Sequence, residues 1–229
     1  MSAVREMLRR NGIREAPLAA SVRTRSNPII AVIGSSTASG HGLGQARVSW
    51  VDRYADELRV THPAVTIRNL AVAGYSSFQL VPTGTRRRLR KPRADAAHNV
   101  TAALAERPVA LIVNVPSNDA GSGYAVRHTM KNLHAVVNAA REAGVPTWVT
   151  TSQPRTLDAV GVARLVAMRR AVLRDFGDHA LDFWTPLASP DDMPLPELNQ
   201  GDGAHSNAEG HRLLFEVVRA ADIPARLGL

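Results

Sequence analysis

The chain has 229 residues, 45% of them hydrophobic, and a formal net charge of +8 from 28 Lys and Arg against 20 Asp and Glu. This length and apolar content allow a hydrophobic core, which excludes a disordered chain and a disulfide-stapled mini-protein. Cysteine is absent, which excludes disulfides, thiolate metal sites and a cysteine nucleophile. We expect one globular domain at 28–229, preceded by a basic N-terminal segment at 1–27.

Short β-branched runs alternate with longer amphipathic stretches from residue 29 onward. The pattern predicts five strands, at 29–33, 65–72, 110–115, 147–151 and 180–183. It predicts helices at 48–60, 94–106, 125–143, 157–176 and 207–221. Parallel strands need crossover connections that cover both faces of a sheet, so the alternation predicts a three-layer α/β/α sandwich. Ligands of such sheets bind beyond the carboxyl ends of the strands, so we expect functional residues there.

Membrane and export signals are not evident in the sequence. No apolar run approaches the roughly 18 residues that a membrane-spanning helix requires. The residues before the first predicted strand lack the apolar stretch of a secretory signal. The sequence as it stands therefore indicates a cytoplasmic protein, and an extracytoplasmic one if a signal peptide has been removed.

Two distant segments hold the residue types of an activated serine. The first predicted strand ends in GSSTASG, where Ser36 lies in a turn of small residues. Near the other end, Asp202 and His205 are three residues apart, so the carboxylate can accept a hydrogen bond from Nδ1 and leave Nε2 free as a general base. Alone, the first segment is typical of a tight turn and the second of a helix entry. Together they indicate a serine nucleophile with its base.

Two further strand ends supply donors for an oxygen that becomes negative during acyl transfer. Gly74 can bring its backbone N–H close to a substrate, and Asn118 can offer a side-chain amide. The N–H of Ser36 would be the third donor. Alone, Gly74 is more typical of a turn, and Asn118 of a turn or a cap. Asp119 could position the neighbouring amide or cap the next turn.

In chain order, these segments resemble the four blocks of the SGNH hydrolases, the GDSL-type esterase family, which supply Ser, Gly, Asn and His. The blocks read GSST around Ser36, NLAVAGYSS around Gly74, LIVNVPSNDA around Asn118 and DGAHSNAEGH around Asp202 and His205. Two positions depart from the commonest pattern: Ser35 stands where Asp is usual, and Ser117 stands where Gly often precedes the Asn.

The resemblance implies a flavodoxin-like, five-stranded parallel sheet in the order 2-1-3-4-5. It implies ester hydrolysis in two steps by a triad of Ser36, His205 and Asp202, with Ser36, Gly74 and Asn118 as the oxyanion hole and with no metal or organic cofactor. Serine-containing first blocks occur among members that resemble carbohydrate acetylesterases. The expected substrates are therefore small acyl esters, carbohydrate O-acetyl esters in particular. A lysophospholipase or thioesterase of the same fold is the alternative within the family.

Metal catalysis is a competing hypothesis because the chain holds eight His. No His-Glu-x-x-His pattern occurs, and the six-residue spacing of His205 and His211 does not suit a zinc site. We therefore expect no metal, and we expect His211 to pack against a helix start.

The segment 86–93, RRRLRKPR, holds six cations and no acid. A run this dense is typical of a solvated surface loop, but it could also border the site and attract anionic substrates. Tyr75, Arg86, Arg87 and Arg88 are accordingly the candidate substrate contacts. A non-catalytic protein that binds anions or nucleic acid is the alternative from another functional class. The 4% aromatic content, with no aromatic platform beside the run, argues against nucleic acid.

Overall fold

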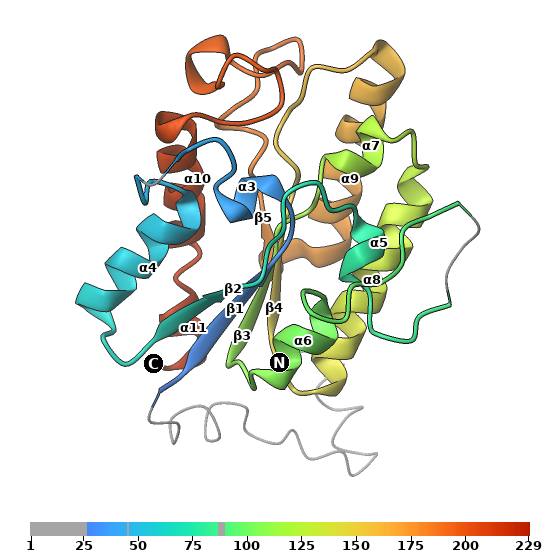
Figure 1. The fold of residues 1–229 in the computed structure, drawn as a ribbon. Coiled ribbons are helices and arrows are strands. Elements are labelled where there is room, and N and C mark those ends of the chain that lie inside the picture. Colours follow the sequence, from blue (N-terminus) through green and yellow to red (C-terminus); the bar gives the residue numbers. More distant parts are fainter. Residues whose placement is uncertain (1–26, 45, 87–89) are drawn as a thin grey trace, which may run out of the picture.

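Five parallel strands form the middle layer of the fold (Figure 1), in a computed structural model that describes residues 27–44, 46–86 and 90–229. The strands are β1 (Ile29–Ile33), β2 (Thr66–Asn69), β3 (Ala110–Val113), β4 (Thr147–Thr150) and β5 (Ala180–Leu181). Their order across the sheet is β2-β1-β3-β4-β5, and all four pairings are parallel. This topology confirms the predicted fold class and strand order.

Helices cover both faces of the sheet (Figure 1). On one face lie α4 (Trp50–Thr61), α10 (Ala208–Ala220) and α11 (Ile223–Leu227). On the other lie α5 (Ser77–Leu80), α6 (Val100–Ala105), α8 (Val126–Glu142) and α9 (Ala159–Phe176). Two more short helices, α3 (Ser36–Ser39) and α7 (Asn118–Gly121), follow the carboxyl ends of β1 and β3. Short 3₁₀ turns occupy Gly177–His179 and Pro196–Leu198.

The alternation of side chains along the strands divides the core in two. In β1, Ile30 and Val32 face the layer that holds α4 and α10, whereas Ala31 and Ile33 face the layer that holds α8 and α9. All four side chains are fully buried, as are those of Ala110, Leu111, Ile112 and Val113 in β3. Complete burial stabilises the fold by roughly 1.5–3 kcal/mol for each large aliphatic side chain. The central strands are therefore a rigid base for the loops that follow them.

The predicted helix at 94–106 is wrong in its first half. α6 begins only at Val100, because Asn99 caps it by accepting a hydrogen bond from the Ala102 N–H at 3.1 Å. Before that cap, Asp95 fixes a turn by accepting from the Ala97 N–H at 2.9 Å. The helices α3, α5 and α7 were not predicted, since four residues are too few to show a helical period.

The predicted strands at 65–72, 110–115 and 180–183 continue past the ends of β2, β3 and β5. Beyond β2 the chain still contacts its neighbour: the Val72 N–H donates to the Gly34 carbonyl at 3.2 Å. The expectation for His211 is confirmed, because its Nδ1 accepts from the N–H of Trp50, the first residue of α4, at 3.1 Å. Residues 1–26 lie outside the described residues, so the predicted basic segment at 1–27 stays a prediction. None of the described helices is both long and apolar enough to cross a membrane.

Candidate active site

Ser36 follows β1 after Gly34 and Ser35, as the first residue of α3, and only 7% of it is exposed. The preceding Ser35 is extended, with φ −123° and ψ −151°, so the chain turns sharply into the helix at Ser36. The N–H of a first helical residue has no carbonyl acceptor within its own helix. Gly34 permits the approach of the next loop, since a Cβ at this position would lie 2.7 Å from the Asn114 carbonyl oxygen. Ser36 is thus held at the carboxyl edge of the sheet, next to the loop that follows β3.

Asp202 and His205 form a hydrogen-bonded pair in the turn before α10. Oδ2 of Asp202 lies 2.6 Å from Nδ1 of His205, and Oδ1 accepts from the N–H groups of Ala204 at 2.8 Å and His205 at 2.9 Å. Burial raises the pKa of Asp202, but the hydrogen bonds from the His205 ring and from the two backbone N–H groups outweigh it and lower the pKa to about 2. A carboxylate oxygen only accepts, so in the neutral ring Nδ1 carries the proton and Nε2 keeps its lone pair.

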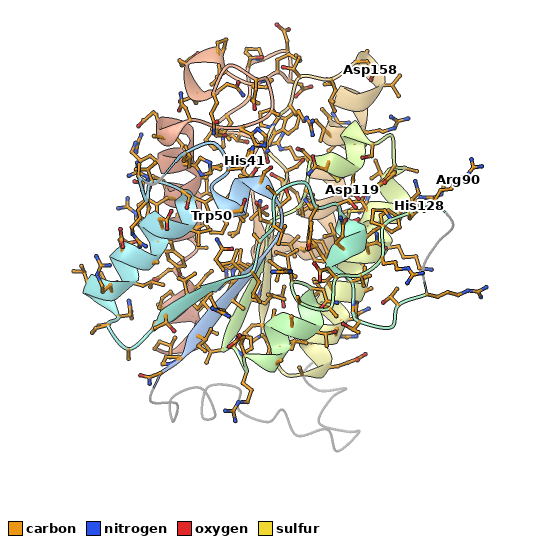
Figure 2. The ribbon with its side chains drawn as sticks, in the orientation of Figure 1. His41, Trp50, Arg90, Asp119, His128 and Asp158 are labelled. Atoms are coloured by element: carbon orange, nitrogen blue, oxygen red, sulfur yellow. The ribbon has the colours of Figure 1, made fainter. Side chains whose placement is uncertain are left out.

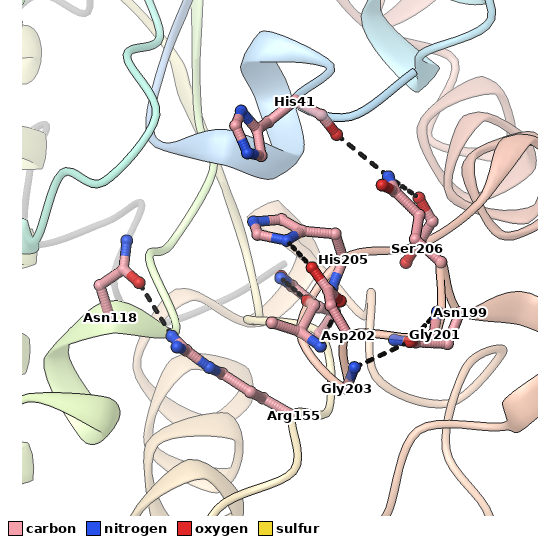
Figure 3. A network of polar contacts seen from close by, with 12 residues as sticks. His41, Asn118, Arg155, Asn199, Gly201, Asp202, Gly203, His205 and Ser206 are labelled. Carbon is pink, nitrogen blue, oxygen red and sulfur yellow. Dashed lines mark hydrogen bonds and ion pairs between the residues drawn. The ribbon is translucent and has the colours of Figure 1, made fainter. Parts of the chain in front are cut away.

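Local hydrogen bonds hold the turn that carries this pair. Oδ1 of Asn199 accepts from the N–H groups of Gly201 at 2.8 Å and Gly203 at 2.9 Å. The Gln200 amide donates to the carbonyls of Ser206 at 2.9 Å and His41 at 3.0 Å. Figure 3 shows these contacts around His205, with the ring of His41 above that of His205. The two ring centroids are 4.9 Å apart, so His41 is a neighbour of the Asp202–His205 pair.

The two other predicted donors are joined through Tyr75. Gly74 has φ +85°, a left-handed conformation that favours glycine, and no atom lies within 4 Å of where its Cβ would be. The next residue, Tyr75, accepts at its carbonyl oxygen from Nδ2 of Asn118 at 2.9 Å. On the other side, Oδ1 of Asn118 accepts from Nη1 of Arg155 at 2.9 Å (Figure 3). The Gly74 loop and the first residue of α7 are therefore fixed to each other.

Asp119 anchors this pair of loops from the interior, beside α5 (Figure 2). It is fully buried and accepts from the Ser77 N–H at 2.7 Å, the Ser77 hydroxyl at 2.5 Å and the Thr129 hydroxyl at 2.9 Å. Burial raises the pKa of Asp119 despite these hydrogen bonds. These contacts tie α7 to the start of α5 and to α8 and do not involve the Asn118 amide, so a role of Asp119 in positioning that amide stays a prediction.

A ring of contacts joins all the loops that carry the predicted site residues. Each neighbouring pair of loops is linked by at least one hydrogen bond or ring contact. In order around the site, the links are Asn69 to Ala38, Asn118 to Tyr75, Arg155 to Asn118, Gln153 to Ala204, Thr156 to Gly203 and His41 to His205. The structure thus assembles the Ser36, Gly74, Asn118 and Asp202–His205 segments at one edge of the sheet. Sequence reasoning missed His41, Arg155 and Gln200, because no local pattern marks them.

Of the four candidate substrate contacts, Tyr75 and Arg86 lie among the described residues. The Tyr75 hydroxyl donates to the Asp95 carboxylate, and burial together with this carboxylate raises the pKa of Tyr75 to about 12. Arg86 is exposed, whereas Arg87 and Arg88 lie outside the described residues. Arg90 lies at the outer edge of the molecule in Figure 2. Within the described ranges, no group of three or more His, Asp or Glu side chains is placed to hold a metal ion.

Among the comparisons with known proteins, a sequence profile gives a family match and the solved structures give a shared fold. The sequence profile of the GDSL-like Lipase/Acylhydrolase family matches residues 32–213. No curated protein matches the sequence. Among solved structures, a G-D-S-L family protein from Desulfitobacterium hafniense has a TM-score of 0.66 at 19% identity, covering 85% of this chain and 99% of that one.

Two further solved structures share the fold. A psychrotrophic esterase from Pseudoalteromonas sp. has a TM-score of 0.62 at 20% identity, covering 89% of this chain and 100% of its own. A carbohydrate acetylesterase family member from Sinorhizobium meliloti has a TM-score of 0.62 at 15% identity, covering 88% of this chain and 100% of its own.

Proposed function

Because the chain belongs to the GDSL-like lipase/acylhydrolase family, and is therefore a carboxylic ester hydrolase, we propose that Ser36 is its nucleophile, His205 its general base and Asp202 the residue that orients the base. The observation that carries this proposal is the 2.6 Å contact between Asp202 and Nδ1 of His205, which leaves Nε2 as a proton acceptor. The ring of contacts between the loops supports a site in which the Asp202–His205 pair acts together with Ser36.

The mechanism follows from the roles of these groups. Nε2 of His205 takes the hydroxyl proton of Ser36 while Oγ attacks the ester carbonyl carbon. The imidazolium that forms is stabilised by Asp202, whose low pKa keeps it ionised. His205 then returns the proton to the departing oxygen, and an alcohol leaves. Water attacks the acyl group by the same route, releases the carboxylic acid and regenerates Ser36.

The negative oxygen of each tetrahedral intermediate needs donors that are in place beforehand. The backbone N–H groups of Ser36 and Gly74 and the amide Nδ2 of Asn118 are the proposed donors. Nδ2 carries two hydrogens, of which one is used by the Tyr75 carbonyl, so one remains for the substrate. Loss of one such donor typically lowers kcat by about 10²- to 10³-fold.

Small acyl esters are the proposed substrates, with carbohydrate O-acetyl esters preferred. The serine at position 35 in the first block supports this preference, since such blocks resemble those of carbohydrate acetylesterases. The fold shared with a carbohydrate acetylesterase family member is compatible with it. A lysophospholipase would instead prefer long acyl chains, which a series of acyl lengths distinguishes. A thioesterase would prefer thioesters, which a thioester with the same acyl chain distinguishes.

The test is release of p-nitrophenol from acetate, butyrate and octanoate esters by the wild type and by Ser36→Ala. We expect turnover to be fastest with acetate and to fall by at least about 10³-fold in the variant. Ser39→Ala is the matched control, because this hydroxyl lies in the same short helix and bonds to the Ser36 carbonyl at 3.2 Å. Substantial turnover by folded Ser36→Ala would contradict the assignment. An inactive, folded wild type would favour anion or nucleic-acid binding, which a salt titration of binding would then test.

A further inference from the structure

Arg155 connects the two halves of the candidate active site. It lies in the loop between β4 and α9, half-buried, and its Nη1 donates to Oδ1 of Asn118 at 2.9 Å. The same loop also supports the Asp202–His205 turn, because the Thr156 N–H donates to the Gly203 carbonyl at 2.7 Å. Figure 3 shows the guanidinium reaching from this loop to the Asn118 amide. No carboxylate of the described residues forms an ion pair with Arg155, so Asn118 is its polar partner there.

The chemistry of the two partners fixes which way the Asn118 amide faces. A guanidinium only donates, so the atom that meets Arg155 is the amide oxygen. A carbonyl only accepts, so the atom that meets Tyr75 is the amide nitrogen. Rotating the amide by half a turn would place oxygen against the Tyr75 carbonyl and N–H against the guanidinium, and would lose both bonds. The two partners together therefore hold the second N–H of Nδ2 in one direction.

The neighbouring helix leaves room for this contact. Gly121 lies one turn after Asn118 in α7, and a Cβ there would lie 3.2 Å from Nη1 and 3.5 Å from Cζ of Arg155. The first separation is tight, so a larger residue at 121 would require the guanidinium to shift by a few tenths of an ångström. The sequence GSG at 121–123 thus agrees with a guanidinium packed against α7.

We propose that Arg155 is a positioning residue for the oxyanion hole: it fixes and polarises the Asn118 amide so that Nδ2 donates to the substrate oxygen. The proposal rests on the function proposed above, in which Asn118 is an oxyanion donor. It assigns Arg155 no direct contact with the substrate. Replacing Arg155 should therefore lower kcat, and this loss should disappear when the Asn118 amide is absent. It should also change the environment of the Asn118 amide, which spectroscopy can detect.

A double-mutant cycle tests this coupling with p-nitrophenyl acetate. We expect Arg155→Met to lower kcat by about 10- to 100-fold with little change in KM, as expected when an interaction made in the transition state is weakened. Arg155→Lys keeps a charged donor without the planar fork and should recover part of the loss. When Asn118 is already Ala, Arg155→Met should lower kcat by no more than about 3-fold, because the effects of coupled residues are not additive.

Arg164→Met is the matched control. This arginine lies in α9, and its Nη1 approaches the Gly123 position rather than Asn118. The Arg164→Met substitution removes a cation from the same neighbourhood without changing a contact of the Asn118 amide, so kcat should stay within about 3-fold of the wild type. Additive losses in the cycle, or a loss confined to KM, would mean that Arg155 acts on the substrate directly and would overturn the proposal.

A second measurement does not depend on turnover. The side-chain NH₂ signals of Asn118, assigned by their loss in Asn118→Ala, should be displaced in the wild type from the positions of a free amide, because Oδ1 and one N–H of Nδ2 are hydrogen-bonded. In Arg155→Met the pair should shift towards the position of a free amide, while the rest of the spectrum stays that of a folded protein. An unchanged pair would overturn the positioning role even if Ser36→Ala is inactive. If the Asn118 signals change in Arg155→Met but the wild type has no esterase activity, the contact between Arg155 and Asn118 is supported and only the proposed function is rejected.

Discussion

Asp202 and Asp119 lie in different parts of the candidate site, and each accepts three hydrogen bonds, yet their pKa values move in opposite directions. Asp202 is partly exposed, with 47% of its side chain accessible, and its pKa is lowered to about 2. Asp119 is fully buried and its pKa is raised. Burial raises the pKa of both, and outweighs the hydrogen bonds only at Asp119.

The difference shows that the number of donors does not decide the state of a carboxylate. Asp119 receives its bonds from one backbone N–H and two hydroxyls, which are neutral. Asp202 receives one from the imidazole of His205, which can become a cation, and water still reaches it. Asp202 is therefore suited to stabilise a charge that appears during a reaction, and Asp119 to hold loops in place. The two should respond differently to substitution.

The largest expected effect is on activity, at Asp202. In Asp202→Asn, the amide can present N–H to Nδ1 of His205, which favours the wrong tautomer and removes the charge that stabilises the imidazolium. We expect kcat for p-nitrophenyl acetate to fall by about 10³- to 10⁴-fold. The free energy of unfolding at pH 7 should change by less than about 1 kcal/mol, because nearly half of the Asp202 side chain is exposed and solvent screens its charge. A large loss of stability with activity retained would reverse the roles assigned to the two aspartates.

The next effect is on stability, at Asp119. Asp119→Ala leaves the Ser77 N–H and the hydroxyls of Ser77 and Thr129 without their acceptor in the interior. Burying such groups unpaired should lower the free energy of unfolding by about 3 kcal/mol, measured by urea denaturation. Thr129→Val removes one of the three hydrogen bonds and should lower the free energy of unfolding by about 1 kcal/mol. If both variants were as stable as the wild type, Asp119 would not be an anchor.

How far the sequence predicted these regions depends on the sequence separation of the contacts. The strand pattern predicted a parallel sheet covered by helices, and the family resemblance implied its strand order. The Asp202–His205 contact joins residues only three positions apart. Arg155 meets Asn118 across 37 positions, and Ser77 meets Asp119 across 42. Neither contact leaves a local signature, because each depends on how the loops after different strands pack. The roles of all the proposed site residues are proposals that the variants test: Ser36, His205, Asp202, Gly74 and Asn118.

The last expected effect, which is absent at pH 7 and grows only as the pH falls, is on the pH dependence of stability, at His211, which shares burial with Asp119 but has no carboxylate bonded to its ring. Burial, together with the nearby Arg53 cation, lowers the pKa of His211 to about 4, although Asp52 opposes this shift. As the pH falls from about 6.5, the ordinary value, to about 4, the unfolded chain takes up a proton that the folded chain does not. The free energy of unfolding should therefore fall by up to about 3 kcal/mol across this window and lose no more from this group below it.

His211→Gln isolates that contribution, because its amide oxygen can still accept from the Trp50 N–H while the side chain no longer titrates. Urea denaturation of both proteins between pH 7 and pH 4 gives the difference in their free energies of unfolding. That difference should move in favour of the variant as the pH falls, since only the wild type retains an imidazole that must stay neutral when folded. Parallel pH profiles would mean that water or a rearranged Arg53 relieves the charge of His211. Burial alone would then not account for the contrast between Asp119 and Asp202.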